Sequence, residues 1–187
     1  VHPATQDITV NVTNVNDNLP VFTSSASFSA AENQTAIGTV TVSDDDGDDI
    51  TYSVSGSELE ITSTGVLTFV VAPDYETKTS YTAVVTANDG TYSATQDITV
   101  NVTDVNDVAP VFTSDATFSA EENQTAIGTV TATDEDDDDI TFTVSGSELL
   151  ITSDGVLTFV VAPDYETKTS YTAVVTANDG TYSATQD

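Results

Sequence analysis

The sequence predicts an all-β protein made of tandem seven-stranded Greek-key β-sandwiches of immunoglobulin-like architecture, arranged end to end. Three observations predict this fold. The sequence repeats with a period of 90 residues, which indicates a tandem array of whole domains. Within each repeat, apolar residues alternate with polar ones at strand spacing. Turn-forming residues then divide these runs into short segments, as expected for a sandwich.

The repeat is close to identical from copy to copy. Residues 4–17 match 94–107 with one difference, Asn14 in place of Asp104. We therefore expect the chain to contain the last strand and linker of a preceding repeat (1–17), one full repeat (18–107), and a second repeat that lacks its final strand (108–187).

Seven segments of the full repeat show the strand pattern. Ile98, Val100 and Val102, for example, alternate with threonine and asparagine, so one face of that strand is apolar. The expected strands, in order, are 21–30, 36–43, 49–55, 58–63, 66–71, 80–88 and 94–103.

Turn signals separate these strands. Pro20 opens the first strand, where the missing N–H costs no ladder hydrogen bond. The later breaks fall at Asn33-Gln34, Asp44–Asp49, Ser55-Gly56-Ser57, Ser63-Thr64-Gly65, Pro73-Asp74 and Asn88-Asp89-Gly90.

The chain is strongly acidic, with 31 Asp and Glu against two lysines and a formal net charge of −29. Nucleic acid and anionic membrane surfaces are thereby disfavoured, because both require a basic protein surface. The chain has no cysteine, which excludes disulfides and thiolate metal sites. No apolar run is long enough to insert into a membrane. We predict that the chain is not an enzyme and has no catalytic residues, since cysteine is absent and His2 is the one histidine.

The acids gather at the ends of the predicted strands, which suggests a cation site. Carboxylates about 4 Å apart repel each other by about 4 kcal/mol at an effective dielectric near 20. Oxygen ligands without His or Cys favour calcium over transition metals. The alternative is a solvated acidic surface that keeps the chain soluble. The run DDDGDD at 44–49 is not an EF-hand loop, because its glycine is fourth and position twelve is not Glu.

Five motifs, in order and in both copies, resemble those of cadherin repeats in single-chain bacterial proteins. The inter-repeat signature appears as DVNDVAPVF at 104–112 and as NVNDNLPVF at 14–22. The other four are AEN or EEN, a DxD pair, PDYE and ANDG, which in the first repeat begin at residues 31, 44, 73 and 87.

The resemblance implies three calcium ions at a junction between repeats, bound by both neighbours and the linker. At the central junction the implied ligands are Glu32, Asp74, Glu76, Asp104, Asn106, Asp107, Asp134, Asp136 and Asp179, with main-chain oxygens of Val105 and Val108. At the upstream junction, Asn16, Asn18, Asp44, Asp46 and Asp89 would hold at most one ion.

The chain departs from the family pattern at several places, among them the loop after each DxD pair, which is shorter than the family's usual form. Val108 replaces the last Asn of the signature, and Asn14 replaces an Asp, which lowers the ligand charge upstream. Glu122, Asp164 and Glu166 have no following linker and would form half a site. There is no Trp, so the tryptophan exchange of vertebrate cadherins has no residue to use.

We expect calcium-rigidified extension repeats of a bacterial surface or secreted adhesin, active in cell adhesion or biofilm. The partners would be neighbouring repeats of the same chain. We also hypothesise head-to-tail self-association, in which the strand at 8–13 completes the last repeat of another molecule. The alternative is a module whose repeats themselves recognise polysaccharide or another repeat, with Tyr52, Tyr75, Tyr81 and Tyr92 as candidate stacking residues. Of these, Tyr81 alternates inward and is expected in the core, while Tyr75 and Tyr92, near turns, stay open candidates.

Overall fold

The computed structural model describes residues 2–187. The chain forms two compact units, of which the first ends at Thr103 and the second is Asp104–Asp187. Residues 104–107, expected as the end of the full repeat, belong to the second unit. The repeat boundaries at 17/18 and 107/108 remain predictions from the sequence period. Residues 2–187 contain no helix long and apolar enough to cross a membrane.

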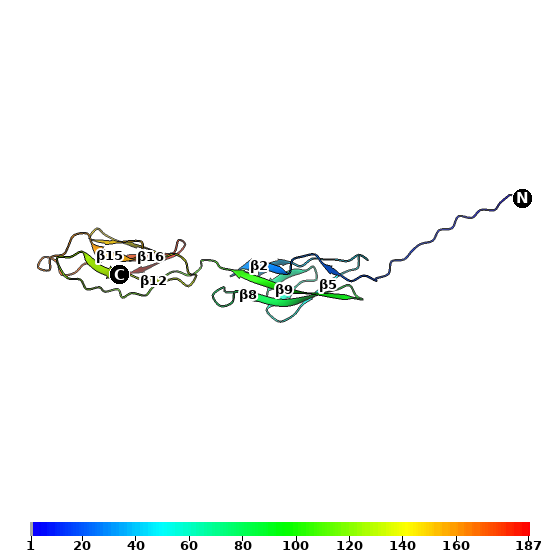
Figure 1. The fold of residues 1–187 in the computed structure, drawn as a ribbon, viewed down its shortest axis with the longest axis horizontal. Helices are drawn as coiled ribbons and strands as arrows, with labels where there is room; N and C mark the ends of the chain where they lie inside the picture. Colours follow the sequence, from blue (N-terminus) through cyan, green and yellow to red (C-terminus); the bar gives the residue numbers. More distant parts are fainter. Residues whose placement is uncertain (1) are drawn as a thin grey trace. The chain divides into compact units, whose positions relative to one another are not determined.

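The first unit is a two-layer β-sandwich, which confirms the predicted fold class. Its strands are β1 (Val21–Phe22), β2 (Ser27–Ala31), β3 (Ala36–Thr39), β4 (Val42–Ser43), β5 (Thr51–Val54), β6 (Leu59–Ile61), β7 (Val66–Phe69), β8 (Ser80–Asn88) and β9 (Ser93–Thr103). One sheet has the order β2-β9-β8-β5 and the other β3-β7-β6, while β1 pairs with β4 (Figure 1). The chain changes sheet between β5 and β6 and again between β7 and β8, as a Greek-key sandwich requires.

The apolar faces of the two sheets form one core. Leu67 of one sheet and Val85, Ile98 and Val100 of the other are at most 1% exposed. The polar residues between them in the sequence lie on the outer faces, which is the alternation the sequence predicts. Apolar burial of this kind stabilises the fold by about 25 cal/mol per Å².

Two expected strands are each divided in the structure. The segment 21–30 becomes β1 and β2, and 36–43 becomes β3 and β4. The division occurs because the carbonyl of Thr41 accepts hydrogen bonds from the N–H groups of both Thr23 and Ser24, at 2.8 and 3.3 Å. The first segment therefore pairs with β4 and then crosses to pair with β9.

Gly65 lies in the tight turn between β6 and β7. Its φ is +82°, and a Cβ built on it would lie 2.2 Å from the carbonyl oxygen of Val40. The N–H of Val40 also donates a hydrogen bond to the Gly65 carbonyl, at 2.8 Å. The close approach of two backbones explains why this position is glycine.

The second unit repeats this architecture with fewer paired residues. Its strands are β10 (Val111–Phe112), β11 (Ala126–Thr129), β12 (Ala132–Thr133), β13 (Thr141–Val144), β14 (Leu149–Ile151), β15 (Val156–Phe159), β16 (Val175–Asn178) and β17 (Ser183–Gln186). The sheets have the orders β13-β16-β17 and β11-β15-β14, and β10 pairs with β12.

The second unit has no counterpart of β2. In the first unit β2 pairs in parallel with Thr99–Thr103 of β9, and among residues 2–187 no segment of the second unit pairs in this way with 117–121. Residues 117–121 and 170–174 are consequently not strands, although they match strand residues 27–31 and 80–84.

Candidate calcium centre

Acidic side chains gather at both ends of each unit. We call the group beside the preceding linker the N-side cluster and the group beside the following linker the C-side cluster. The N-side clusters are Asp44, Asp46 and Asp89 in the first unit and Asp134, Asp136 and Asp179 in the second. The C-side clusters are Glu32, Asp74 and Glu76 in the first unit and Glu122, Asp164 and Glu166 in the second.

The charged side chains that are buried all belong to these clusters. Among residues 2–187 they are Glu32, at 4% exposure, and Asp89, Asp136 and Asp179, each at 7%. Burying a carboxylate is unfavourable unless hydrogen bonds or an opposite charge compensate for the lost hydration. Their burial indicates that these side chains have a role other than keeping the surface soluble.

The C-side cluster of the first unit is built by two turns. Glu32 directly follows β2, and Asn33 adopts a φ of 60°, which asparagine tolerates better than most residues. The N–H of Asn33 donates to the Pro73 carbonyl at 3.0 Å, and the N–H of Tyr75 donates to Oε2 of Glu32 at 2.8 Å. These bonds join the turn after β2 to the loop before β8.

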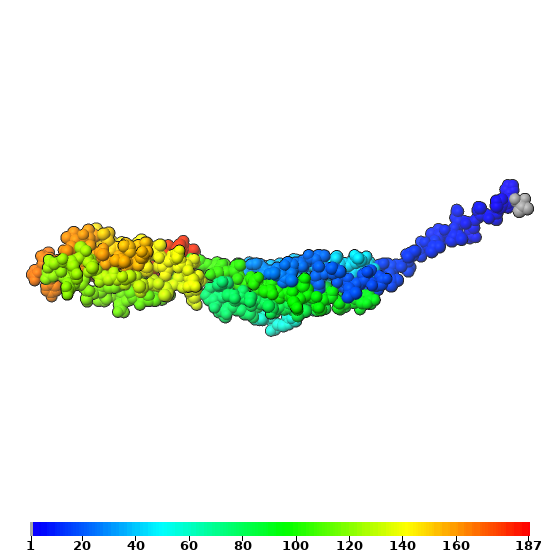
Figure 2. Space-filling model, in the orientation of Figure 1, coloured from blue at the N-terminus to red at the C-terminus, as the bar shows by residue number. Residues whose placement is uncertain are grey.

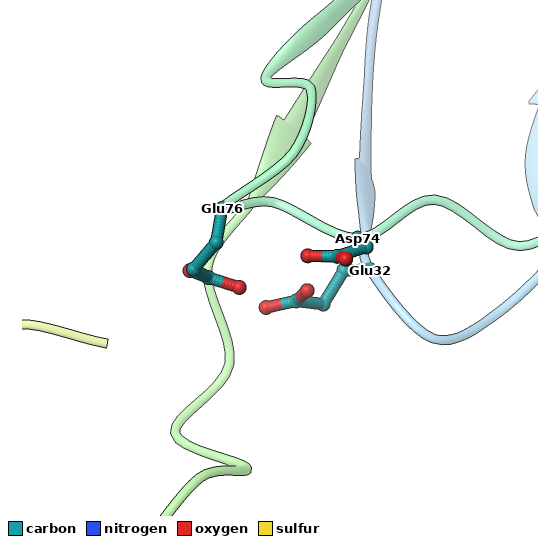
Figure 3. Close-up of side chains that lie close together, drawn as sticks. All are labelled: Glu32, Asp74 and Glu76. Atoms are coloured by element: carbon teal, nitrogen blue, oxygen red, sulfur yellow. The ribbon is translucent and has the colours of Figure 1, made fainter. Parts of the chain in front are cut away.

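The carboxylates of this cluster converge on one space. Figure 3 shows Glu32 on one segment and Asp74 and Glu76 on the other, with their carboxylates facing one another. One carboxylate oxygen from each lies within 4.8 Å of the others. A hydrogen bond from the Thr77 hydroxyl, at 2.8 Å, lowers the pKa of Asp74.

Backbone N–H groups orient the N-side cluster of the second unit. Oδ2 of Asp136 accepts from the N–H groups of Asp107 and Val108, both at 2.9 Å. Oδ1 of Asp179 accepts from the N–H groups of Thr181 and Tyr182, both at 2.6 Å. The linker is thus attached to the loops through Asp136.

The remaining oxygens of this cluster are buried without a hydrogen-bond partner. They are Oδ2 of Asp134, Oδ1 of Asp136, Oδ2 of Asp179 and Oδ1 of Asn106. Buried oxygen acceptors that lack donors are suited to a hard cation, and carboxylate oxygens of Asp134, Asp136 and Asp138 lie within 4.8 Å of one another. A carboxylate oxygen of Asp104 also lies within 4.8 Å of one of Asp136. The residues therefore fit calcium.

The N-side cluster of the first unit has the same construction. Asp46 accepts from the N–H groups of Asp17 and Asn18, at 2.9 and 2.8 Å. Oδ2 of Asp44, Oδ2 of Asp89 and Oδ1 of Asn16 are buried without a partner. The amide of Asn18 instead donates to Asp46 at 2.9 Å, so its side-chain nitrogen is already bonded.

Hydrogen bonds keep these carboxylates ionised. The pKa of Asp46 is lowered mainly by the backbone N–H and side chain of Asn18. Burial raises the pKa of Asp89 and of Asp179, but the N–H groups of the following turn outweigh this effect, and both pKa values are lowered. Asp46, Asp89 and Asp179 therefore stay ionised at neutral pH.

The sequence analysis missed Asp48 and Asp138. A carboxylate oxygen of Asp48 lies within 4.8 Å of those of Asp44 and Asp46, and Asp138 is placed in the same way in the second unit. Burial and repulsion from the neighbouring acids raise the pKa of Asp48. The spacing in the sequence could have identified Asp48 as a cluster member, because Asp44, Asp46 and Asp48 occupy alternate positions of the loop.

The structure therefore brings most of the expected ligands together within each unit. Glu32, Asp74 and Glu76 meet in the first unit, while Asn106 and Asp104 lie with the N-side cluster of the second. The roles of Asp107, and of the main-chain oxygens of Val105 and Val108, remain predictions. It is also a prediction that the C-side cluster of the first unit and the N-side cluster of the second form one site.

Tyr81 lies in the core, as its alternation predicts, and the other candidate tyrosines offer little stacking surface. Tyr81 packs edge-on against Phe69 with ring centroids 5.0 Å apart, and Tyr52 and Tyr75 pack against the core. Tyr92 is 38% exposed. A polysaccharide site across these rings gains no support.

Comparison with known proteins relates this architecture to cadherins. The chain is 36% identical over 198 residues to the human protein "Cadherin EGF LAG seven-pass G-type receptor 2". The aligned region covers 94% of this chain and 7% of that relative. It is 35% identical over 153 residues to human Protocadherin-15, covering 73% of the chain and 8% of that relative. These units are repeats of the cadherin-domain family. No family model matches the chain.

Solved cadherin structures share the fold. Human Protocadherin-24 EC1-2 superposes with a TM-score of 0.73 at 22% identity, covering 89% of this chain and 91% of that one. The human Desmocollin-1 ectodomain gives a TM-score of 0.76 at 22% identity, covering 91% of this chain and 41% of that one. The related cadherin domains are extracellular or cell-surface domains, in agreement with the expected location.

Proposed function

We propose that this chain is a calcium-binding segment of extension repeats in an extracellular adhesin. The observation that carries the proposal is the set of buried oxygens without hydrogen-bond partners on Asn106, Asp134, Asp136 and Asp179. In each of the three aspartates, the second carboxylate oxygen accepts a hydrogen bond from a backbone N–H group, which fixes the orientation of the carboxylate. This preorganisation has a clear use only if a cation occupies the space between them.

Calcium would also offset the repulsion that the fold creates at its ends. The central junction would use the C-side cluster of the first unit, the linker Asp104–Val108 and the N-side cluster of the second. Bound calcium supplies positive charge between these carboxylates, and the ligands come from both repeats. Binding would therefore stiffen the linker and turn a flexible connection into a spacer. Extracellular sites of this kind bind with Kd of about 10⁻⁴–10⁻³ M.

The chain represents a small part of its relatives, 7% of the length of the first human protein. We propose that the parent protein is an adhesin in which near-identical repeats act as interchangeable spacers. A bacterial origin and a biofilm role are part of this proposal. The relatives named above are human proteins, so this part relies on the motif form and on the near-identity of the copies.

Calorimetric titration with calcium tests the proposal. We expect the chain to bind calcium with sub-millimolar to millimolar affinity, and Asp136→Asn to weaken the central site at least tenfold. The matched control is Asp115→Asn, which removes the same charge from an exposed position outside the clusters. Equal binding by all three proteins, or no binding by any, would overturn the proposal.

A further inference from the structure

The two N-side clusters share the backbone contacts that hold their central aspartate. Oδ2 of Asp46 accepts hydrogen bonds from two consecutive backbone N–H groups of the preceding segment, at 2.9 and 2.8 Å. Oδ2 of Asp136 accepts from the two corresponding N–H groups, both at 2.9 Å. The second of these residues is Asn18 before the first unit and Val108 in the second. One side chain able to donate hydrogen bonds is therefore replaced by one that is not.

In the first unit, the side-chain amide of Asn18 bridges two carboxylates. Its Nδ2 donates to Oδ1 of Asp46 at 2.9 Å and to Oδ1 of Asp17 at 3.0 Å. Asn18 belongs to the segment coloured blue in Figure 2, which leads into the first unit. Two N–H donors directed at two carboxylates provide part of the compensation that a cation would provide. The first unit thus supplies a donor of its own at this place.

In the second unit, the corresponding carboxylate oxygen has no donor. Oδ1 of Asp136 is buried without a hydrogen-bond partner, and the side chain of Val108 has no N–H or O–H group. Asp136 is also 7% exposed, whereas Asp46 is only half-buried. A buried carboxylate oxygen without a partner is unfavourable unless a donor or a cation reaches it. The second unit leaves this oxygen available to a cation.

We propose that the side chain at position 18 or 108 sets the calcium affinity of the adjacent N-side cluster, and that Val108 makes the cluster of the second unit the tighter site. The inference rests on the proposed function and adds a residue that tunes affinity without binding the ion through its side chain. A cation that binds Oδ1 of Asp46 must displace the Asn18 amide, whereas one that binds Oδ1 of Asp136 displaces no protein donor. Loss of one hydrogen bond to a charged group corresponds to a change of about tenfold in Kd.

The clusters also differ at a second linker position, where Asn14 corresponds to Asp104. A carboxylate in place of an amide adds negative charge, which also favours calcium in the second unit. A difference in affinity between the two wild-type units would therefore have two causes. Exchange of the residues at 18 and 108 separates these causes, because it leaves positions 14 and 104 unchanged.

Amide NMR spectra of the full chain, recorded through a calcium titration, observe the two clusters separately. The N–H of Tyr92 donates to Oδ1 of Asp89 at 2.7 Å, and the N–H of Tyr182 donates to Oδ1 of Asp179 at 2.6 Å. Each of these amides contacts an aspartate of one N-side cluster, so its chemical shift reports calcium binding at that cluster.

Reciprocal substitutions test the proposal. Val108→Asn supplies a donor to Oδ1 of Asp136, so the calcium concentration at the midpoint of the Tyr182 shift should rise about tenfold. Asn18→Val removes the donor from Asp46, so the midpoint for Tyr92 should fall by a similar factor. Each variant should leave the midpoint of the other unit unchanged.

Leucine provides the control for side-chain size, because it has the shape of asparagine without the N–H donors. Val108→Leu should keep the wild-type midpoint, and Asn18→Leu should behave as Asn18→Val does. If Val108→Leu and Val108→Asn shifted the midpoint equally, size rather than hydrogen bonding would be responsible and the proposal would be overturned. Calcium binding with unchanged midpoints in Val108→Asn and Asn18→Val would overturn this inference alone. Absence of any calcium response at both amides would overturn the proposed function as well.

Discussion

At the level of single residues, the acidic loop of the first unit concentrates charge that the protein alone does not neutralise. Asp48 shows this most directly, because burial and the nearby Asp44, Asp46 and Asp89 raise its pKa. Its neighbours Asp46 and Asp89 have lowered pKa values because they accept backbone hydrogen bonds. Asp48 is therefore the residue whose charge most needs a cation.

Replacing Asp48 should have opposite effects with and without calcium. Asp48→Asn removes a repulsive charge, so the melting temperature in chelator should rise. In calcium the same change removes a ligand oxygen, so the gain in melting temperature on adding calcium should shrink. Thermal unfolding in the two buffers measures both effects.

The control for this experiment is Asp45→Asn, which changes an exposed residue of the same loop. The main causes of the raised pKa of Asp48 are burial and the charges of Asp44, Asp46, Asp89 and Asp49. The control variant should change neither melting temperature appreciably. If Asp48→Asn lowered the melting temperature in chelator, the repulsion at this loop would have been overstated.

Gly155 is the counterpart of Gly65 in the second unit, and its backbone leaves equally little room for a side chain. Its φ is +83°, and a Cβ would lie 2.2 Å from the carbonyl oxygen of Val130. We expect Gly155→Ala to destabilise the second unit by roughly 3 kcal/mol or more, since strain and a backbone clash combine. Chemical denaturation measures the loss.

Gly146 provides the matched control. It has the same φ of +83°, but nothing lies within 4 Å of its Cβ position. Gly146→Ala should cost about 1 kcal/mol, from the positive φ alone. Similar losses for the two variants would mean that the close approach to Val130 does not matter.

At the level of elements, the two units differ in one strand. In the first unit β9 holds β2 and the start of β8 in their sheet. In the second unit the corresponding segments, 117–121 and 170–174, are not strands. Backbone without ladder hydrogen bonds opens more readily than backbone within a sheet.

Hydrogen exchange should reveal this difference. Amides of 117–121 and 170–174 should exchange faster than those of 27–31 and 80–84. The near-identical sequences make the comparison direct, because intrinsic exchange rates nearly match. Equal protection of the paired segments would contradict the account of β9.

The sequence predicted most elements because alternation and turn residues agree along the repeat. The strand predicted at 80–88 has the same bounds as β8 in the structure. The prediction failed where the chain changes sheet, at Thr23–Ser24 and Val40–Thr41, because the shared carbonyl of Thr41 depends on tertiary pairing. The motifs identified the cluster residues, but not that Asp136 would bind the linker N–H groups. That contact joins residues 28 and 29 positions apart, which no local pattern predicts.

At the level of the whole molecule, the net charge of −29 and the acidic clusters at the ends of each unit support one account. The core of each unit is made of apolar side chains, while the ends of the units and the linker residues Asp104 and Asp107 carry carboxylates. Calcium would supply the missing positive charge at that connection and limit the motion of the linker.

Small-angle scattering through a calcium titration tests this account most directly. The full chain is measured at low protein concentration, and the Asp136→Asn variant is the control. The account predicts that the radius of gyration and the maximum dimension rise as calcium approaches millimolar concentration, and that the control requires more calcium. Identical scattering in chelator and in calcium would contradict it.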